Sequence, residues 1–117
     1  MTHFIKRENY WGNIEYKKDF INMTPEKIKK YATQLKFRII EGSGTGIYIV
    51  GVLDNGQIVG IHENNIIRCD SIMQNICDEV NVCISSNKTI DINKKYKLLI
   101  YVLKSKFDIE DIPYLSG

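Results

Sequence analysis

The chain has 117 residues, a formal net charge of +2, and 26% charged against 44% hydrophobic residues. These values are typical of one globular domain and exclude a disordered tail, a collagen-like chain and a coiled-coil rod. No apolar run approaches the roughly 20 residues that span a bilayer, and the N-terminus lacks the pattern of a secretory signal. We therefore expect a cytoplasmic protein with no membrane contact.

The N-terminal part predicts a strand followed by a helix. Residues 1–11 are a polar and aromatic lead-in, and the loose alternation of residues 13–20 predicts a short strand. Thr24-Pro25-Glu26 is typical of a helix start, and Gly42 is a typical stop. We place the basic residues of this helix on its outer face: Lys27, Lys29, Lys30, Lys36 and Arg38.

The remaining elements predict an α+β domain. The expected order is an apolar strand (47–53), an Asn-Gly hairpin of type I′, a strand (57–61), a helix (63–79), a strand around 82–84, a turn region (87–93) and a strand (96–104). The string β-α-β-β-α-β-β predicts one domain over residues 12–106, with a mostly antiparallel sheet and both helices on one face.

Three motifs favour structural roles over chemistry. The GSGTG run at residues 42–46 follows a helix rather than a strand, so it is typical of a connector and not of a phosphate-binding loop. Cys69 and Cys77 fall on an apolar helical stripe and are expected in the core. His62 lies where it would cap the second helix. We therefore predict no cofactor or metal in this segment.

Basic residues with nearby aromatic rings are typical of RNA binding, because phosphates pair with cations and bases stack on rings. The alternative is that the lysines only solvate the surface. The candidate RNA-binding residues are Lys17, Lys18, Lys27, Lys29, Lys30, Lys94, Lys95 and Lys97, together with Tyr16.

Two carboxylates, Glu15 and Asp54, are the candidate catalytic residues, because converging carboxylates can hold a divalent metal. The simpler interpretation, which we favour, makes Glu15 an ordinary strand residue and Asp54 part of the hairpin turn.

GNIEYK (12–17) and QLKFRIIEGSGTGIYIVGVLDNGQIVGI (34–61) resemble the N-terminal accessory domain of the GTP-binding protein 1 and 2 family, which are translation-elongation-factor-like GTPases. The resemblance extends to about Lys104 and weakens after Ile61. It implies a non-catalytic module that assists RNA or ribosome engagement or packs on a GTPase domain. GTP and Mg²⁺ would then bind a parent chain beyond Gly117, and residues 107–117 would begin that following domain.

A more distant resemblance, to the AlbA-like domain of Schlafen-type proteins, rests on Glu15-Tyr16-Lys17 and on the Gly51–Gly56 hairpin. It implies a nucleic-acid-binding domain, with metal-dependent ribonuclease activity as a further alternative. The third carboxylate that such activity needs is missing from the expected place, and Glu8 lies one or two positions away from it. A last alternative is a protein-interaction domain that docks through the apolar residues of its tail: Ile109, Ile112, Tyr114 and Leu115.

Overall fold

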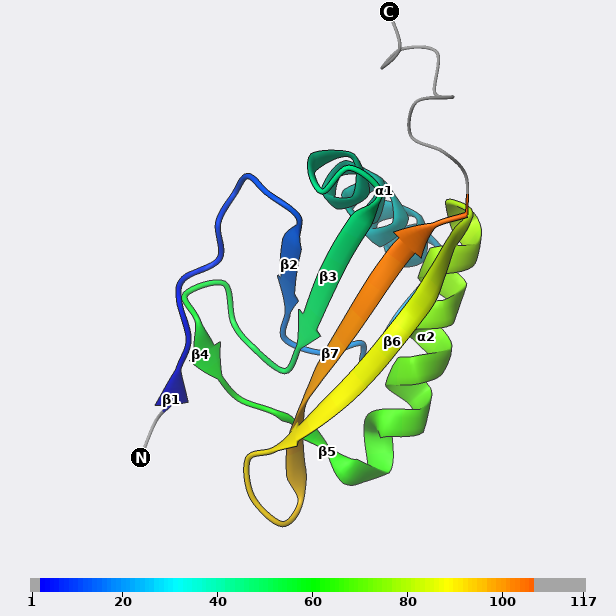
Figure 1. The fold of residues 1–117 in the computed structure, drawn as a ribbon. Coiled ribbons are helices and arrows are strands. Elements are labelled where there is room, and N and C mark those ends of the chain that lie inside the picture. The colour runs from blue at the N-terminus through cyan, green and yellow to red at the C-terminus, as the bar shows by residue number, and fades with distance from the viewer. Residues whose placement is uncertain (1–2, 107–117) are drawn as a thin grey trace, which may run out of the picture.

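The computed structural model describes residues 3–106. In chain order the elements are β1 (His3–Phe4), β2 (Ile14–Lys17), α1 (Pro25–Glu41), β3 (Thr45–Val50), β4 (Gln57–Ile58), β5 (Ile61–His62), the 3-10 helix η1 (Glu63–Asn65), α2 (Ile66–Glu79), β6 (Val82–Asp91) and β7 (Tyr96–Ser105) (Figure 1). Two α-helices with a mostly antiparallel sheet confirm the predicted α+β class. The tail at 107–117, with its four apolar docking candidates, lies outside the described residues.

The main sheet has five strands, with β3 and β7 at its centre. β3 pairs in parallel with β2 and antiparallel with β7. β7 also pairs antiparallel with the short β5 and with the long β6. A separate two-stranded sheet joins β1 to β4. The β2 edge lies beside the N-terminal segment, and this neighbourhood forms the candidate site.

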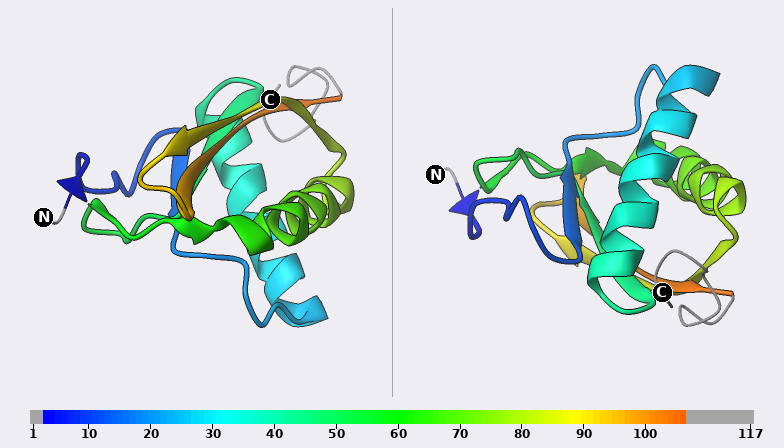
Figure 2. Two further views of the ribbon diagram at one scale, coloured as in Figure 1. Left: turned by 90° about the horizontal axis from the view of Figure 1, so that it is seen from below. Right: turned by 90° about the horizontal axis from the view of Figure 1, so that it is seen from above.

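Different parts of the chain cover the two faces of the sheet. Both helices lie on one face (Figure 2), where they enclose a core that includes Leu35, Tyr48 and Met73. A smaller cluster around Tyr16 and Val52 lies on the other face, under the N-terminal segment and the β4 region. Neither described helix is long and apolar enough to span a membrane.

The local signals at helix ends are confirmed. The Thr24 hydroxyl accepts a hydrogen bond from the Lys27 backbone N–H at 3.2 Å, and Pro25 opens α1. Gly42 follows the last residue of α1 and starts the turn into β3, so the GSGTG run is a connector. His62 Nδ1 accepts from the Asn64 backbone N–H at 3.1 Å, which caps the short helix η1 ahead of α2.

The predicted hairpin forms, with Val52 bridged to Ile58 and the Leu53 N–H donating to the Gln57 carbonyl at 2.9 Å, but the predicted type I′ turn is wrong. β3 ends at Val50, where Gly51, with a φ of +106°, turns the chain off the main sheet. Within residues 53–57 only Gly56 has a positive φ, whereas a I′ turn requires it at both central residues. Gly56 N–H donates to the Leu53 carbonyl, a type I turn followed by a glycine bulge. β4 pairs with β1 on one side, and on the other side Ile58 bridges to Val52, which lies beyond the end of β3.

The predicted turn region at 87–93 is mostly strand. β6 continues to Asp91, and the turn is confined to the four residues that follow. Residues 85–91 are exposed and all but Ile90 are polar, so no alternation of apolar residues marks them as a strand. The ladder with β7, which ends in the pair Asp91–Lys97 and a salt bridge between their side chains, holds this segment instead.

Candidate functional site

A cavity of about 550 Å³ lies where the N-terminal segment, β2, α1 and the turn after β3 meet. It combines three carboxylates, two cations and three aromatic rings within one enclosure. Its lining residues are Glu8, Tyr10, Trp11, Glu15, Lys17, Thr33, Gln34, Phe37, Arg38 and Asp54.

Arg38 is the structural centre of this cavity. Its side chain is buried, which corrects the prediction that it lies on the outer face of α1. Its Nε donates to Glu15 Oε1 at 3.1 Å, and its Nη1 donates to the carbonyls of Gly12 at 2.9 Å and Tyr10 at 3.3 Å. One guanidinium therefore fixes α1, β2 and the preceding loop relative to one another.

Glu15 is also buried, at 8% exposure, and it accepts from Arg38 across the interface between β2 and α1. In a simple amphipathic strand the apolar side chains face the covering helix, but in β2 the charged side chains do so. Glu15 and Lys17 face α1, while Tyr16 packs on the opposite face of the sheet with its hydroxyl on the Lys6 carbonyl at 2.5 Å. Tyr16 is therefore outside the cavity that holds Glu15.

Glu8 is the third carboxylate of the cavity, although its spacing argued against it. Its Oε2 accepts from the Tyr16 backbone N–H at 2.5 Å, and its own N–H donates to the Asp54 carbonyl at 2.8 Å. The pKa of Glu8 is raised from 4.5 to about 7, mainly because burial disfavours the charged carboxylate. The hydrogen bond from the Tyr16 N–H acts in the opposite direction and lowers this pKa. A hydrogen bond with Glu15 and the negative charges of Glu15 and Asp54 raise that pKa further.

Lys17 reaches into the cavity and is largely buried there. Its Nζ donates to Gln34 Oε1 at 2.6 Å, lies 3.9 Å from Glu15 Oε2 and sits 4.0 Å from the centre of the Tyr31 ring. Burial lowers the pKa of Lys17, while the nearby carboxylates raise it. The positive charge of Lys17 therefore offsets part of the negative charge of the carboxylates that line the cavity.

Three aromatic side chains form the outer rim of the cavity. Tyr10 and Trp11 are exposed by 79% and 63%, and Phe37 on α1 by 38%. Trp11 lies between the other two, with ring centres 5.4 Å from Tyr10 and 6.1 Å from Phe37. Large rings are usually buried, so a group of three exposed beside a polar cavity indicates a surface for a ligand.

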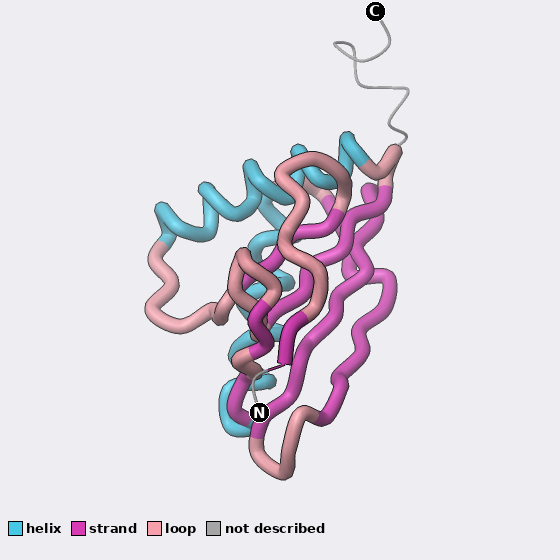
Figure 3. Tube along the Cα trace, turned by 90° about the vertical axis from the view of Figure 1, so that its left-hand side faces the viewer, coloured by secondary structure: helices cyan, strands magenta, loops and turns pink. Residues whose placement is uncertain are grey.

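The structure does not gather the predicted lysines on one surface. Lys27 and Lys30 are exposed on α1, and Lys30 is close enough to Lys17 to lower its pKa. Lys18 is exposed after β2, whereas Lys29 lines a gap between the helices. Lys94, Lys95 and Lys97 lie at the β6–β7 turn, at the opposite end of the molecule from α1 (Figure 3).

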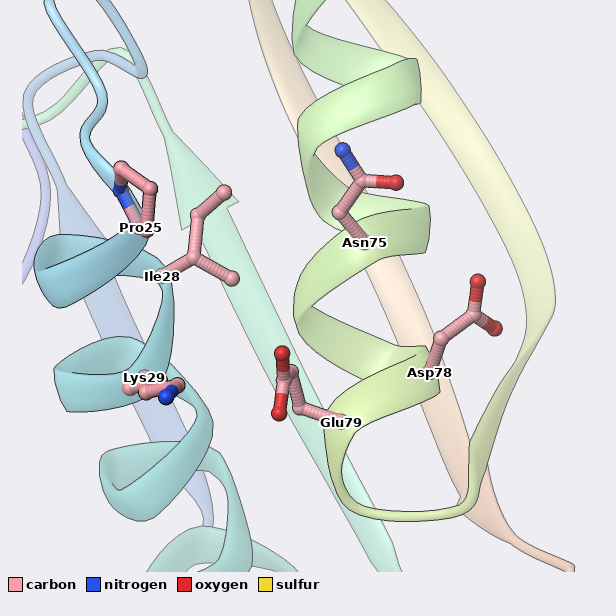
Figure 4. Close-up of a pocket in the computed structure, with 6 residues that line it drawn as sticks. All are labelled: Pro25, Ile28, Lys29, Asn75, Asp78 and Glu79. Atoms are coloured by element: carbon pink, nitrogen blue, oxygen red, sulfur yellow. The ribbon is translucent and has the colours of Figure 1, made fainter.

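A second hollow, of about 520 Å³, separates α1 from α2. Lys29 contributes from α1, and Asp78 and Glu79 from α2, with Glu79 extending into the gap (Figure 4). These three side chains are exposed, and neither buried charges nor aromatic rings line this hollow. The cavity around Arg38 is therefore the better candidate site.

Residues with other reactive chemistry do not supply an alternative site. Within residues 3–106, no three His, Cys, Asp or Glu side chains are placed to hold a metal ion together. Cys69 and Cys77 are buried, as predicted, and burial raises their thiol pKa values to about 11 and about 12, which keeps them protonated.

Sequence reasoning missed Glu8, Gln34, Phe37 and Arg38. Arg38 has a detectable signal, because it lies three residues after Leu35 and one before Ile39, on the buried stripe of α1. Gln34 lies four residues before Arg38 and Phe37 directly before it, so both border that stripe. No local pattern marks Glu8, whose role depends on how the N-terminal segment folds back on β2.

No protein-family model matches this chain. It is 44% identical over 52 residues to GTP-binding protein 2 of Mus musculus and of Homo sapiens, a match that covers 44% of this chain and 9% of each relative. It is also 32% identical over 101 residues to an uncharacterized protein of Acanthamoeba polyphaga mimivirus, covering 84% of this chain and 54% of that protein. The chain thus spans less than a tenth of the first relatives and about half of the third, and part of it is similar to a GTP-binding protein.

Proposed function

We propose that this chain is a non-catalytic module of a GTPase-like protein and that it engages RNA, free or in the ribosome. The similarity of 52 residues to GTP-binding protein 2 supports the GTPase context. The 117 residues contain no GxxxxGK[ST] run, the backbone cradle for nucleotide phosphates. GTP binding and hydrolysis would therefore belong to another part of the protein.

Calorimetric titration of the chain with GTP and Mg²⁺ tests the non-catalytic part of this proposal. We expect no heat that corresponds to micromolar affinity. Micromolar binding of GTP to these 117 residues would contradict it.

One observation carries the RNA part: an exposed stripe of α1 leads directly into the cavity. Lys27, Lys30, Gln34 and Phe37 follow each other at helical spacings of three, four and three residues, so they lie along one side of the helix. At 1.5 Å per residue, this stripe is about 15 Å long. Its first half is basic and exposed, and its second half lines the cavity.

The two halves suit the two parts of a single-stranded nucleic acid. Lys27 and Lys30 present ammonium groups to solvent, where they can pair with phosphates. Both cations of the cavity, Lys17 and Arg38, are already bonded to protein groups, so the cavity offers a phosphate no free partner. Phosphates on the lysines and bases at the aromatic rim satisfy both requirements.

Salt-titrated anisotropy of a fluorescently labelled single-stranded RNA is the test. Two phosphate contacts in single-stranded RNA predict a slope of about −1.4 in log K against log salt, or about sevenfold weaker binding from 50 to 200 mM. The double variant Lys27→Glu/Lys30→Glu should abolish most of this slope. The matched double variant Lys94→Glu/Lys95→Glu, at the far end of the molecule, should bind nearly as the native chain.

Either of two results would contradict RNA binding through α1. One is an affinity that does not change with salt. The other is a greater loss from the Lys94→Glu/Lys95→Glu variant than from the α1 variant, which would move the interface to the β6–β7 turn.

A further inference from the structure

We infer that the cavity binds one unpaired guanine base of single-stranded RNA, stacked at the aromatic rim and hydrogen-bonded through its Watson–Crick edge to the Asp54 carboxylate. This inference rests on the proposed RNA binding and names the base that the site selects. Three features of the described residues lead to it: the rings, the acceptor set and the charge balance.

The rings supply a stacking surface, because Tyr10 and Trp11 stay largely exposed although Trp11 contacts both neighbouring rings and the Arg38 guanidinium lies 5.7 Å from the centre of the Phe37 ring. Trp11 and Phe37 are tilted by 52° to each other, and Tyr10 stands edge-on to Trp11 at 82°. Side chains exposed to this degree leave ring faces open to solvent, at the mouth of a cavity large enough for a small molecule. A base is a flat ring that stacks on such faces, and any base can do so.

The acceptor set then discriminates among bases. An ionised carboxylate only accepts hydrogen bonds, and Asp54 is the exposed carboxylate of the cavity. Glu8 lies further inside, where its Oε2 accepts from the Tyr16 N–H and lies 3.7 Å from Arg38 Nη2. Guanine offers N1–H and N2–H₂ side by side, two donors that match the two oxygens of one carboxylate. Uracil offers a single N3–H between two carbonyl oxygens, which the carboxylates would repel. Adenine and cytosine each offer one amino donor and are intermediate.

The cations of the cavity are committed to protein groups. Arg38 is bound to Glu15 and to two backbone carbonyls, and Lys17 is bound to Gln34. They compensate part of the acidic charge without offering a phosphate site. A neutral base enters such a cavity more readily than an anionic phosphate, and the phosphates remain on the exposed part of α1.

The quenching of tryptophan fluorescence reports on this site directly, because Trp11 is the single tryptophan of the chain. The probes are RNA hexamers of uridine with one central guanosine, adenosine or cytidine, and hexauridine itself. We expect the guanosine hexamer to quench Trp11 and to bind about tenfold tighter than hexauridine, the discrimination typical of one good carboxylate–base pairing.

Two exposed positions allow variants that keep the fold. Asp54→Asn replaces an acceptor with a mixed donor and acceptor, so the preference for the guanosine hexamer should fall to about twofold or less. Phe37→Ala should weaken the binding of all four hexamers by about tenfold, because it removes stacking without changing the acceptors. Phe4→Ala, a 59% exposed ring on β1 away from the cavity, is the matched control and should change neither.

The outcomes separate this inference from the proposed function. Salt-dependent binding that is lost in Lys27→Glu/Lys30→Glu, but with unquenched Trp11 or no preference for guanosine, overturns the guanine site and leaves RNA binding intact. A guanosine preference that survives Asp54→Asn also overturns the assigned acceptors. No binding of any hexamer by fluorescence or anisotropy overturns both.

Discussion

The two helices pack on the same sheet by different means. α2 contacts it with an apolar stripe of fully buried residues such as Met73 and Ile76. α1 places Leu35 and Ile39 in the same core but adds Arg38, which pairs with the buried Glu15 of β2. On the α2 side, the Tyr101 hydroxyl of β7 donates to Asp70 at 2.6 Å, whereas the α1 side buries an ion pair and borders the cavity. The buried ion pair therefore distinguishes the side of the domain that carries the candidate site.

The largest expected effect comes from breaking the ion pair between α1 and β2. Arg38→Met would leave Glu15 buried without its main partner, and losing one member of a buried pair costs about 3–5 kcal/mol of unfolding free energy. Urea denaturation measures this loss. Lys27→Met, on the exposed side of the same helix, should stay within about 0.5 kcal/mol. Adding Glu15→Gln to Arg38→Met should restore part of the stability, because it removes the uncompensated charge; no recovery would contradict an electrostatic cause.

On the α2 side, shortening a buried apolar side chain should lower stability only through the cavity that it leaves. Met73 is fully buried, and Met73→Ala should cost about 2–5 kcal/mol. Ile67 is on the same helix at 84% exposure, so Ile67→Ala is the control and should be nearly neutral. Thermal unfolding of both variants distinguishes them, and equal melting temperatures would show that α2 does not pack as described.

The turn that carries Asp54 offers a smaller, steric test. Gly56 has a φ of +93°, and a Cβ there would lie 2.1 Å from the Ile5 carbonyl oxygen. Gly12 has a similar φ of +98° but nothing within 4 Å of its Cβ position. Both alanine variants bear the strain of positive φ, about 1–3 kcal/mol, and only Gly56→Ala also displaces the N-terminal segment. Chemical denaturation should therefore rank Gly56→Ala below Gly12→Ala, and equal losses would argue against the contact between Gly56 and Ile5.

The smallest effect is the pH dependence that Glu8 contributes. Its pKa is about 7 in the folded chain and near 4.5 when unfolded, so the folded state binds more protons between these values. Stability from Glu8 should therefore fall as pH rises from about 4.5 through 7. The full shift would give about 2.5 kcal/mol between pH 5 and pH 8, and because solvent screens part of it, the native chain should lose about 1–2 kcal/mol relative to Glu8→Gln. Parallel curves for the two proteins would mean that Glu8 titrates normally, and Glu79→Gln, at an exposed site, serves as the control.

The apolar contacts of this fold could be predicted from the sequence. Helical spacing located both helices, and the Thr24-Pro25 start of α1 is confirmed to the residue. Cys69 and Cys77 lie in the core because they repeat with the apolar period of α2. These features depend on local spacing and on burial, and both are visible in the sequence of a single strand or helix.

The candidate site depends on contacts between residues that are far apart in the sequence, and no local pattern predicts such contacts. Glu8 is eight residues from the Tyr16 amide that it binds, and Arg38 is 23 residues from Glu15. Asp54 reaches the cavity because Gly51 turns the chain away from the sheet instead of continuing a regular hairpin. A charged residue on an apolar stripe, such as Arg38, is the one sequence signal that would have revealed this site.

The most direct test of RNA binding at this side of the molecule is amide NMR of the labelled chain, titrated with the single-guanosine RNA hexamer. The account predicts shifts of the Trp11 indole and of amides in residues 8–17, 27–38 and 53–56, with residues 92–97 unchanged. Shifts confined to the β6–β7 turn, or no shifts at concentrations that saturate anisotropy, would contradict it.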